Sequence, residues 1–167
     1  MLAPSIGGNA AVAVAAERAE GRVAVKTFHV EPQSNRSTQA LTEDLIVDLC
    51  SRYRVLEVHM PEGGFIRSSE LLEGRGVPIV GAHPSPSRLV AASGTFDRLL
   101  NERKLIHDGD PQTRTQILAA IKKVTETGER YLPGDGSRAI GAVVMAVHAA
   151  TAFYPEAYVG SPTVGVW

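Results

Sequence analysis

The chain has 167 residues, enough for one domain with a sizeable core, and its 44% hydrophobic and 21% charged residues are typical of a folded globular protein. A formal net charge of −1 excludes a global field that would draw nucleic acid or an anionic membrane to the surface. The single cysteine, Cys50, excludes an internal disulfide framework and fits a reducing compartment. No stretch approaches the roughly 20 apolar residues that cross a bilayer. The first residues also lack the pattern of a signal peptide, so we expect no membrane partner.

The first half of the chain predicts a β-hairpin and two helix–strand pairs. Ala10–Ala16 is an apolar run, and after Gly21 the apolar residues Val23, Val25 and Phe28 have polar neighbours, which predicts two strands joined by a turn near Gly21. After Ser37, a typical N-cap residue, apolar residues recur every three to four positions. The expected elements are strands at Ala10–Ala16 and Arg22–Val30, a helix at Ser37–Tyr53, a strand at Val55–His59, a helix at Ile66–Glu73 and a strand at Val77–Val80.

The second half predicts three helices, one short strand and an extended tail. Asp110 followed by Pro111 is a typical helix start, with the aspartate as the cap. The expected elements are a helix at Ser85–Glu102, a strand at Lys104–His107, a helix at Pro111–Thr125, a loop at Gly128–Gly136 and a buried helix at Ser137–Phe153. This order predicts a three-layer α/β domain over residues 1–152, with a mixed central β-sheet flanked by helices, and an extended C-terminal tail over 153–167.

The second half also carries a recognisable pattern. Phe96-Asp97-Arg98-Leu99-Leu100 is followed by Arg103 to Pro111, which ends in His-Asp-Gly-Asp-Pro, and later by an Ala-rich helix at Ala139–Ala150. This pattern resembles the C-terminal nuclease domain of phage terminase large subunits, in which a segment ends in H-x-G-D/N-P. The order of the first-half elements is similar as well, so the resemblance spans Leu2 to Ala152. It implies an RNase H-like fold, and the chain has no Gly-rich phosphate loop of an ATPase motor.

The resemblance also implies where the catalytic acids of such a nuclease belong. About three carboxylates hold two divalent metals roughly 4 Å apart in enzymes of this kind. The matching positions hold Ala3 in the opening segment, Met60 (or at best His59) before a proline turn, and Gly141 at the start of the last helix. Mg²⁺ and Mn²⁺ prefer oxygen ligands. We therefore expect no catalytic residue, no metal ligand and no cofactor at these three positions.

Other acids keep a nuclease open as an alternative. Glu62 and Asp135 lie in loops near the expected site and could rebuild a metal site for Mg²⁺ or Mn²⁺. Asp110 is expected to cap a helix. His107 and Asp108 are expected to end a strand, because they are too close together in sequence to form a typical metal cluster.

The tail carries the hypothesis of partner binding. Aromatic anchors dominate the energy of many protein interfaces. Terminal segments are ordered only where they are tied down, so this tail should either fold back on its own domain or dock on another subunit. The expected partner-binding residues are Phe153, Tyr154, Tyr158, Val164 and Trp167.

Together these features favour a phage protein in which an inactive terminase-nuclease-like fold serves as a structural or binding module. We expect it to be head-associated, as in capsid decoration, and to occur in the virion or the host cytoplasm. Its expected partners are phage head or packaging proteins or further copies of itself. Two alternatives stay open: a metal-dependent DNA endonuclease acting in packaging, and a protein that binds DNA or the packaging motor without cutting. DNA is not the favoured partner, because the basic residues are scattered without interleaved aromatics.

Overall fold

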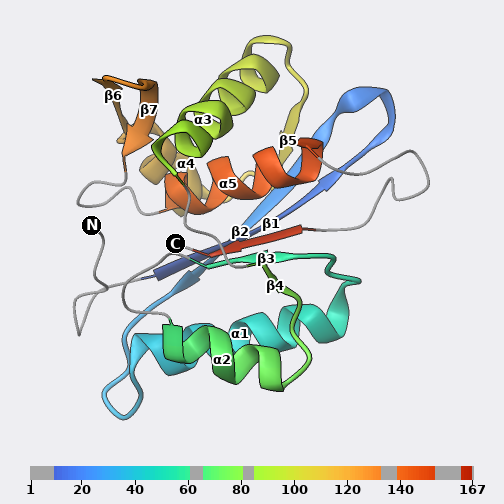
Figure 1. Ribbon diagram of the computed structural model, residues 1–167, viewed down its shortest axis with the longest axis vertical. Helices are drawn as coiled ribbons and strands as arrows, with labels where there is room; N and C mark the ends of the chain where they lie inside the picture. Colours follow the sequence, from blue (N-terminus) through green and yellow to red (C-terminus); the bar gives the residue numbers. More distant parts are fainter. Residues whose placement is uncertain (1–9, 61–65, 81–84, 133–138, 153–162, 167) are drawn as a thin grey trace.

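The computed structural model describes residues 10–60, 66–80, 85–132, 139–152 and 163–166 (Figure 1). Its elements are β1 (Ala10–Glu17), the 3₁₀ turn η1 (Ala19–Gly21), β2 (Val23–Val30), α1 (Thr38–Arg52), β3 (Val58–His59), α2 (Ile66–Gly74), β4 (Ile79–Val80), α3 (Pro86–Asn101), β5 (Leu105–His107), α4 (Pro111–Leu118), β6 (Ile121–Thr125), β7 (Gly128–Leu132), α5 (Ala139–Ala152) and β8 (Thr163–Val166). Strands and helices alternate along most of the chain, except that β6 is followed directly by β7.

The described strands form one six-stranded sheet and a separate two-stranded hairpin, β6–β7. The order in the large sheet is β4-β3-β8-β1-β2-β5. β1 runs antiparallel to both β2 and β8, whereas β3 is parallel to β4 and β8, and β5 is parallel to β2. The prediction of a mixed sheet is therefore confirmed. The predicted hairpin is confirmed as well, and Glu20 and Gly21 turn the chain with φ angles of 64° and 65°.

Helices cover both faces of the sheet and give three layers, as predicted (Figure 1). On one face, α3 and α5 pack against Ala13 and Ala15 of β1 in one apolar cluster. On the other face, Val12 and Val14 of the same strand pack with residues of α1 and α2 in a second cluster. Because β1 is buried on both sides, its sequence is a continuous apolar run instead of an alternating one. This run places β1 in the middle of the fold.

Side chains cap three of the helices, and the caps of α1 and α4 were predicted from the sequence. Ser37 Oγ accepts a hydrogen bond from Ala40 N at 3.1 Å at the start of α1. Ser85 Oγ accepts a hydrogen bond from Arg88 N at 3.2 Å at the start of α3. Asp110 caps α4, and Pro111 follows at a position where no N–H is needed. Each cap contributes about 1 kcal/mol and fixes where its helix begins.

The prediction of one helix from Pro111 to Thr125 is wrong, because α4 ends at Leu118. Ile121–Thr125 is instead strand β6, and it pairs with β7 in the segment predicted as a loop. Ile121 and Val124 of β6 follow Ile117 at the three- to four-residue spacing of a helix, which favoured the helix prediction. In the structure these two side chains are 66% and 72% exposed. They therefore do not form the buried stripe that a helix would need.

The last described residues lie inside the sheet and not beyond the domain. Thr163–Val166 form β8, which is inserted between β1 and β3. Val164, predicted as a partner anchor in an extended tail, is paired along the backbone with Val14 and Val58. For these four residues the structure agrees with the first of the two alternatives, in which the tail folds back on its own domain. The other expected anchors, Phe153, Tyr154, Tyr158 and Trp167, lie outside the described residues.

No helix in the described part of the chain combines the length and apolar character needed to cross a bilayer. The most apolar helix, α5, has 14 residues and packs on the sheet.

Candidate functional site

The site implied by the sequence lies at one end of the sheet, where β3 and β8 both finish. His59 of β3 is paired with Gly165 of β8, and the two strands are parallel. Val166, the next residue of β8, is paired with Val12 near the start of β1. The carboxyl ends of β3 and β8 therefore lie at the same end of the sheet as the first residues of β1.

Helix α5 starts at this same end of the sheet (Figure 1). Its first residue, Ala139, donates its backbone N–H to Gln116 Oε1 at 2.9 Å. The amide nitrogen of Gln116 lies 3.4 Å from His29 Nδ1, and His29 is paired with Ala11 near the start of β1. Gly141, one of the positions at which the resemblance expects an acid, is the third residue of α5.

The sequence analysis gave two candidates, Met60 and His59, for the acid position at the end of β3. In the structure their side chains lie on opposite faces of the sheet. Met60 is 4% exposed and belongs to the apolar cluster that faces α1 and α2. Val58 belongs to the same cluster, so the alternation along the strand turns His59 toward α5 on the opposite face. A side chain at position 59 can therefore reach the space below α5, and one at position 60 cannot.

His59 forms a buried pair with Glu57, which the sequence analysis missed. The His59 Nε2 atom lies 2.9 Å from Glu57 Oε1, and the imidazole is 1% exposed. Its Nδ1 atom is buried without a hydrogen-bond partner in the described part of the structure. The signal was present in the sequence, because residues i and i+2 of a strand share a face.

His148 of α5 is held as a neutral side chain. Its Nδ1 atom lies 3.1 Å from Thr95 Oγ1, which connects α5 to α3. Burial lowers the pKa of His148, and the positive charge of Arg88 and a contribution from His59 lower it further. The imidazole is therefore suited to packing between two helices at neutral pH.

Asp110 is confirmed as a helix cap, with its Oδ2 atom 2.6 Å from Thr113 N. The hydrogen bonds from Thr113 lower the pKa of Asp110, and the neighbouring His29 lowers it further. The His29 Nε2 atom lies 3.3 Å from the Asp110 carboxylate, so the cap also ties α4 to the end of β2. His107 and Asp108 accept hydrogen bonds from the backbone N–H groups of Gly109 and Asp110, respectively, and so stabilise the turn between β5 and α4.

Carboxylates do not gather at this end of the sheet in the residues that the structure describes. Among them, no three His, Cys, Asp or Glu side chains are grouped so that they could hold a metal ion. The side chain of Met60 is a thioether and that of Gly141 is a hydrogen atom, so neither supplies the oxygen ligands that hard divalent cations prefer. Ala3, Glu62 and Asp135 lie outside the described residues.

Cys50 is partly buried in α1, and burial raises the pKa of its thiol. A raised pKa keeps the sulfur protonated and unreactive.

Comparison with known proteins gives one informative match. No protein-family model matches this sequence, and no curated protein matches it. The fold is similar to the crystal structure of the HK97 bacteriophage large terminase, with a TM-score of 0.74 and 14% sequence identity. The match covers 87% of this chain and 37% of the terminase chain, so this chain spans little more than a third of that protein. The predicted RNase H-like α/β architecture is therefore confirmed as a terminase-like fold.

Proposed function

We propose that this chain is a phage protein that uses a terminase-nuclease-like fold as a structural or binding module and does not cut DNA. The observation that carries the proposal is the chemistry at the end of β3 and the start of α5. There the acid positions implied by the fold hold His59, Met60 and Gly141. Two-metal cleavage needs several carboxylates at that place.

The partners of such a module would be phage head or packaging proteins, or further copies of the chain. We favour a head-associated role, such as capsid decoration, in the virion or the host cytoplasm. Support comes from the likeness to a bacteriophage protein and from the aromatic residues Phe153, Tyr154 and Tyr158. The strand β8 weakens the argument for Val164 as an anchor, since its backbone is used in the sheet.

The first experiment is a calorimetric titration of the protein with Mn²⁺, beside cleavage of supercoiled plasmid DNA in the presence of Mn²⁺ or Mg²⁺. The proposal expects no saturable binding of metal and no nicking. Micromolar binding of Mn²⁺ together with metal-dependent cleavage would overturn it.

A metal-dependent endonuclease is the second candidate, and the positions of two acids in the sequence favour it. Glu62 follows β3 by three residues and Asp135 precedes α5 by four, so both belong to segments that adjoin the candidate site. If the plasmid is cut, the variants Glu62→Gln and Asp135→Asn identify the source. Loss of cleavage in either variant assigns that carboxylate to a rebuilt metal site, whereas unchanged cleavage points to a contaminating nuclease.

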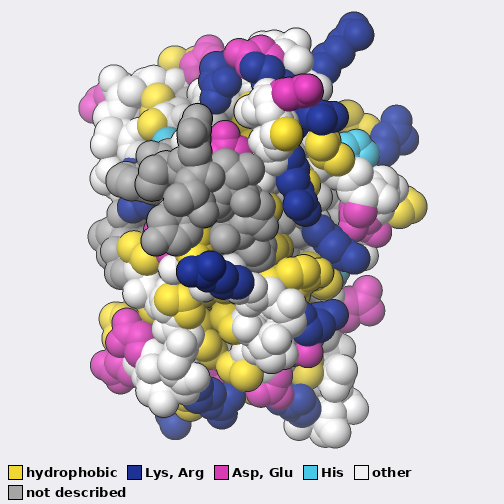
Figure 2. All heavy atoms as spheres, turned by 90° about the vertical axis from the view of Figure 1, so that its right-hand side faces the viewer, with side chains coloured by type: hydrophobic (Ala, Val, Ile, Leu, Met, Phe, Trp, Pro, Cys, Tyr) yellow, Lys and Arg dark blue, Asp and Glu magenta, His cyan; other side chains and the backbone are white. Residues whose placement is uncertain are grey.

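A protein that binds DNA or the packaging motor without cutting is the third candidate. Figure 2 shows Lys and Arg side chains interspersed with Asp, Glu and hydrophobic side chains on one face of the molecule. A surface of this kind has no field of a single sign, and the net charge of the chain is −1. Retention on duplex DNA that falls steeply with salt concentration would support this candidate against a role in the head.

The head-associated form is tested by incorporation into phage particles. The variant Tyr158→Ala is preferable to removal of Tyr158–Trp167, because that deletion also removes β8. Loss of the variant from purified particles, with an unchanged thermal unfolding midpoint, would support an anchoring role for Tyr158. Normal incorporation would count against it.

A further inference from the structure

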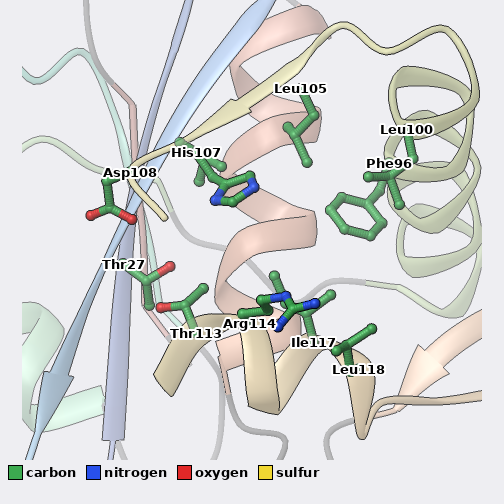
Figure 3. A pocket seen from close by; sticks show the side chains of 11 residues that line it. Thr27, Phe96, Leu100, Leu105, His107, Asp108, Thr113, Arg114, Ile117 and Leu118 are labelled. Atoms are coloured by element: carbon green, nitrogen blue, oxygen red, sulfur yellow. The ribbon is translucent and has the colours of Figure 1, made fainter. Parts of the chain in front are cut away.

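A second site lies between the edge strand β5, strand β2 and helices α3 and α4. The structure has a cavity of about 140 Å³ here (Figure 3). Its walls are mainly apolar and come from all four elements. They include Val25, Phe96, Leu105 and Ile117.

One polar side chain that lines this cavity has a hydroxyl without a hydrogen-bond partner among the described residues. Thr27 of β2 lines the cavity and is 6% exposed. Its Oγ1 atom is buried and makes no hydrogen bond within the described part of the structure. A buried hydroxyl without a partner destabilises a fold, so such groups are nearly always satisfied by protein, water or a ligand. The unpartnered hydroxyl therefore marks a place that can receive a hydrogen-bonding group.

The mouth of the cavity carries further polar groups. Figure 3 shows Thr27 and His107 on the side formed by the strands, opposite the apolar side chains of α3 and α4. Gly109 N donates to His107 Nδ1 at 3.0 Å, so Nδ1 is the acceptor and Nε2 is the ring nitrogen that can donate. Arg114 and Asp108 also line the cavity and have opposite charges. Together they favour a neutral ligand over an anion or a cation.

The size of the cavity restricts the ligand further. An apolar cavity of about 150 Å³ in another protein accommodates one benzene molecule. A space of about 140 Å³ thus suits a single ring or a branched aliphatic group of that size. Phe96 in the wall already contacts one ring edge-to-face, that of Tyr131, and its wall position leaves it able to contact a second.

We propose that this cavity is a binding site for a neutral, single-ring ligand that carries one hydroxyl or carbonyl group. The ring lies among Phe96, Leu105 and Ile117, and its polar group bonds to the Thr27 hydroxyl. None of positions 59, 60 and 141 lines this cavity, so the proposal does not depend on whether the chain cuts DNA.

The test is an NMR titration of the full chain with phenol and, separately, with toluene, which has a similar ring but no hydrogen-bonding group. Both probes should give saturable shifts confined to β2, β5, α3 and α4. Phenol should bind about tenfold more tightly, as expected for one added hydrogen bond to a buried group. Absence of saturable shifts at millimolar phenol, or equal affinity for the two probes, would overturn the proposal.

Variants at Thr27 assign the difference to its hydroxyl. The nearly isosteric Thr27→Val should weaken phenol binding to the level of toluene and leave toluene unchanged, while Thr27→Ser should keep the preference for phenol. The matched control is Thr42→Val, a buried threonine of α1 whose hydroxyl bonds to Thr38 O, and it should change neither affinity. If Thr27→Val does not fold, intermolecular NOEs from phenol to the Val25 and Leu105 methyl groups of the unaltered protein decide. Their absence would refute the site.

Discussion

The sharpest structural prediction concerns β8, because the sequence alone left its role open. We consider a truncated chain that lacks residues 163–167. Within the described sheet, β8 pairs with four residues of β1 and two of β3, and no other strand joins those two elements. Removal of β8 therefore divides the sheet into β1-β2-β5 and β3-β4.

The expected cost follows from this pairing. A backbone hydrogen bond contributes about 0.5–1.5 kcal/mol net, so the loss of a ladder of this length costs on the order of 3–6 kcal/mol. Small domains are stable by about 5–15 kcal/mol in total. The truncated chain should therefore lose a large part of its stability and expose backbone groups of β1, whose residues Val12 and Ala13 are fully buried.

Urea denaturation followed by far-ultraviolet circular dichroism measures this effect. The control is removal of Trp167 alone, which leaves all four residues of β8 and so keeps their pairing with β1 and β3. If both truncations unfold at the same urea concentration as the full chain, β8 does not hold the sheet together. The segment would then be free to bind a partner, as the sequence first suggested.

Three further predictions test the packing on the α5 face. Phe96→Ala should destabilise the fold by about 3–5 kcal/mol in urea denaturation, because Phe96 is 1% exposed and its ring contacts Tyr131 edge-to-face. The pKa of His148 is lower in the folded chain than its ordinary value of 6.5. When the pH decreases below 6.5, the unfolded chain therefore binds a proton at this residue more readily than the folded chain does, and the free energy of unfolding decreases. His148→Gln should flatten this fall, and an unchanged pH profile would contradict the assignment. Burial and the nearby Asp97 raise the pKa of Tyr131 to about 12, so Asp97→Asn should lower it in an ultraviolet titration of tyrosinate.

Much of the fold was predictable because its signals are local. The caps Ser37, Ser85 and Asp110 and the turn at Gly21 each act within a few residues of the elements that they start or join. The boundaries of α1 and α3 were therefore predicted to within a residue. The strand pairing of Lys104–His107 with β2 needed tertiary information, but its apolar character was enough to predict a strand.

The errors arose where local and tertiary signals differ. Ile121 and Val124 have helical spacing from Ile117, but the chain turns at Gly128, with a φ of 127°, and β6 pairs with β7 instead. The strand β8 is short, contains Gly165 and pairs only with residues far away in sequence. No local pattern identifies such a strand, because it is stabilised by backbone hydrogen bonds to β1 and β3, which lie on either side of it.

The candidate site was predictable in its composition but not in its geometry. The sequence alone identified positions 59, 60 and 141 as lacking acids. The i, i+2 spacing of Glu57 and His59 was visible in the sequence, but the analysis did not use it. The unpartnered hydroxyl of Thr27 could not be identified from the sequence, because it depends on which face of β2 is covered.

The orientation of β3 also limits how a metal site could arise in this fold. A carboxylate at position 60 would lie among Val58, Leu72 and Val77, where an unpaired charge costs several kcal/mol, and it would face away from α5. Position 59 faces α5 and already has Glu57 beside it, so an acid there would have a second carboxylate within reach. Because His59 occupies that position and Gly141 the start of α5, at least two substitutions separate these described residues from a carboxylate cluster. In the proposal that this chain does not cut DNA, acids are thus missing from two elements, β3 and α5. Restoring a metal site would therefore need more changes than replacing a single missing ligand.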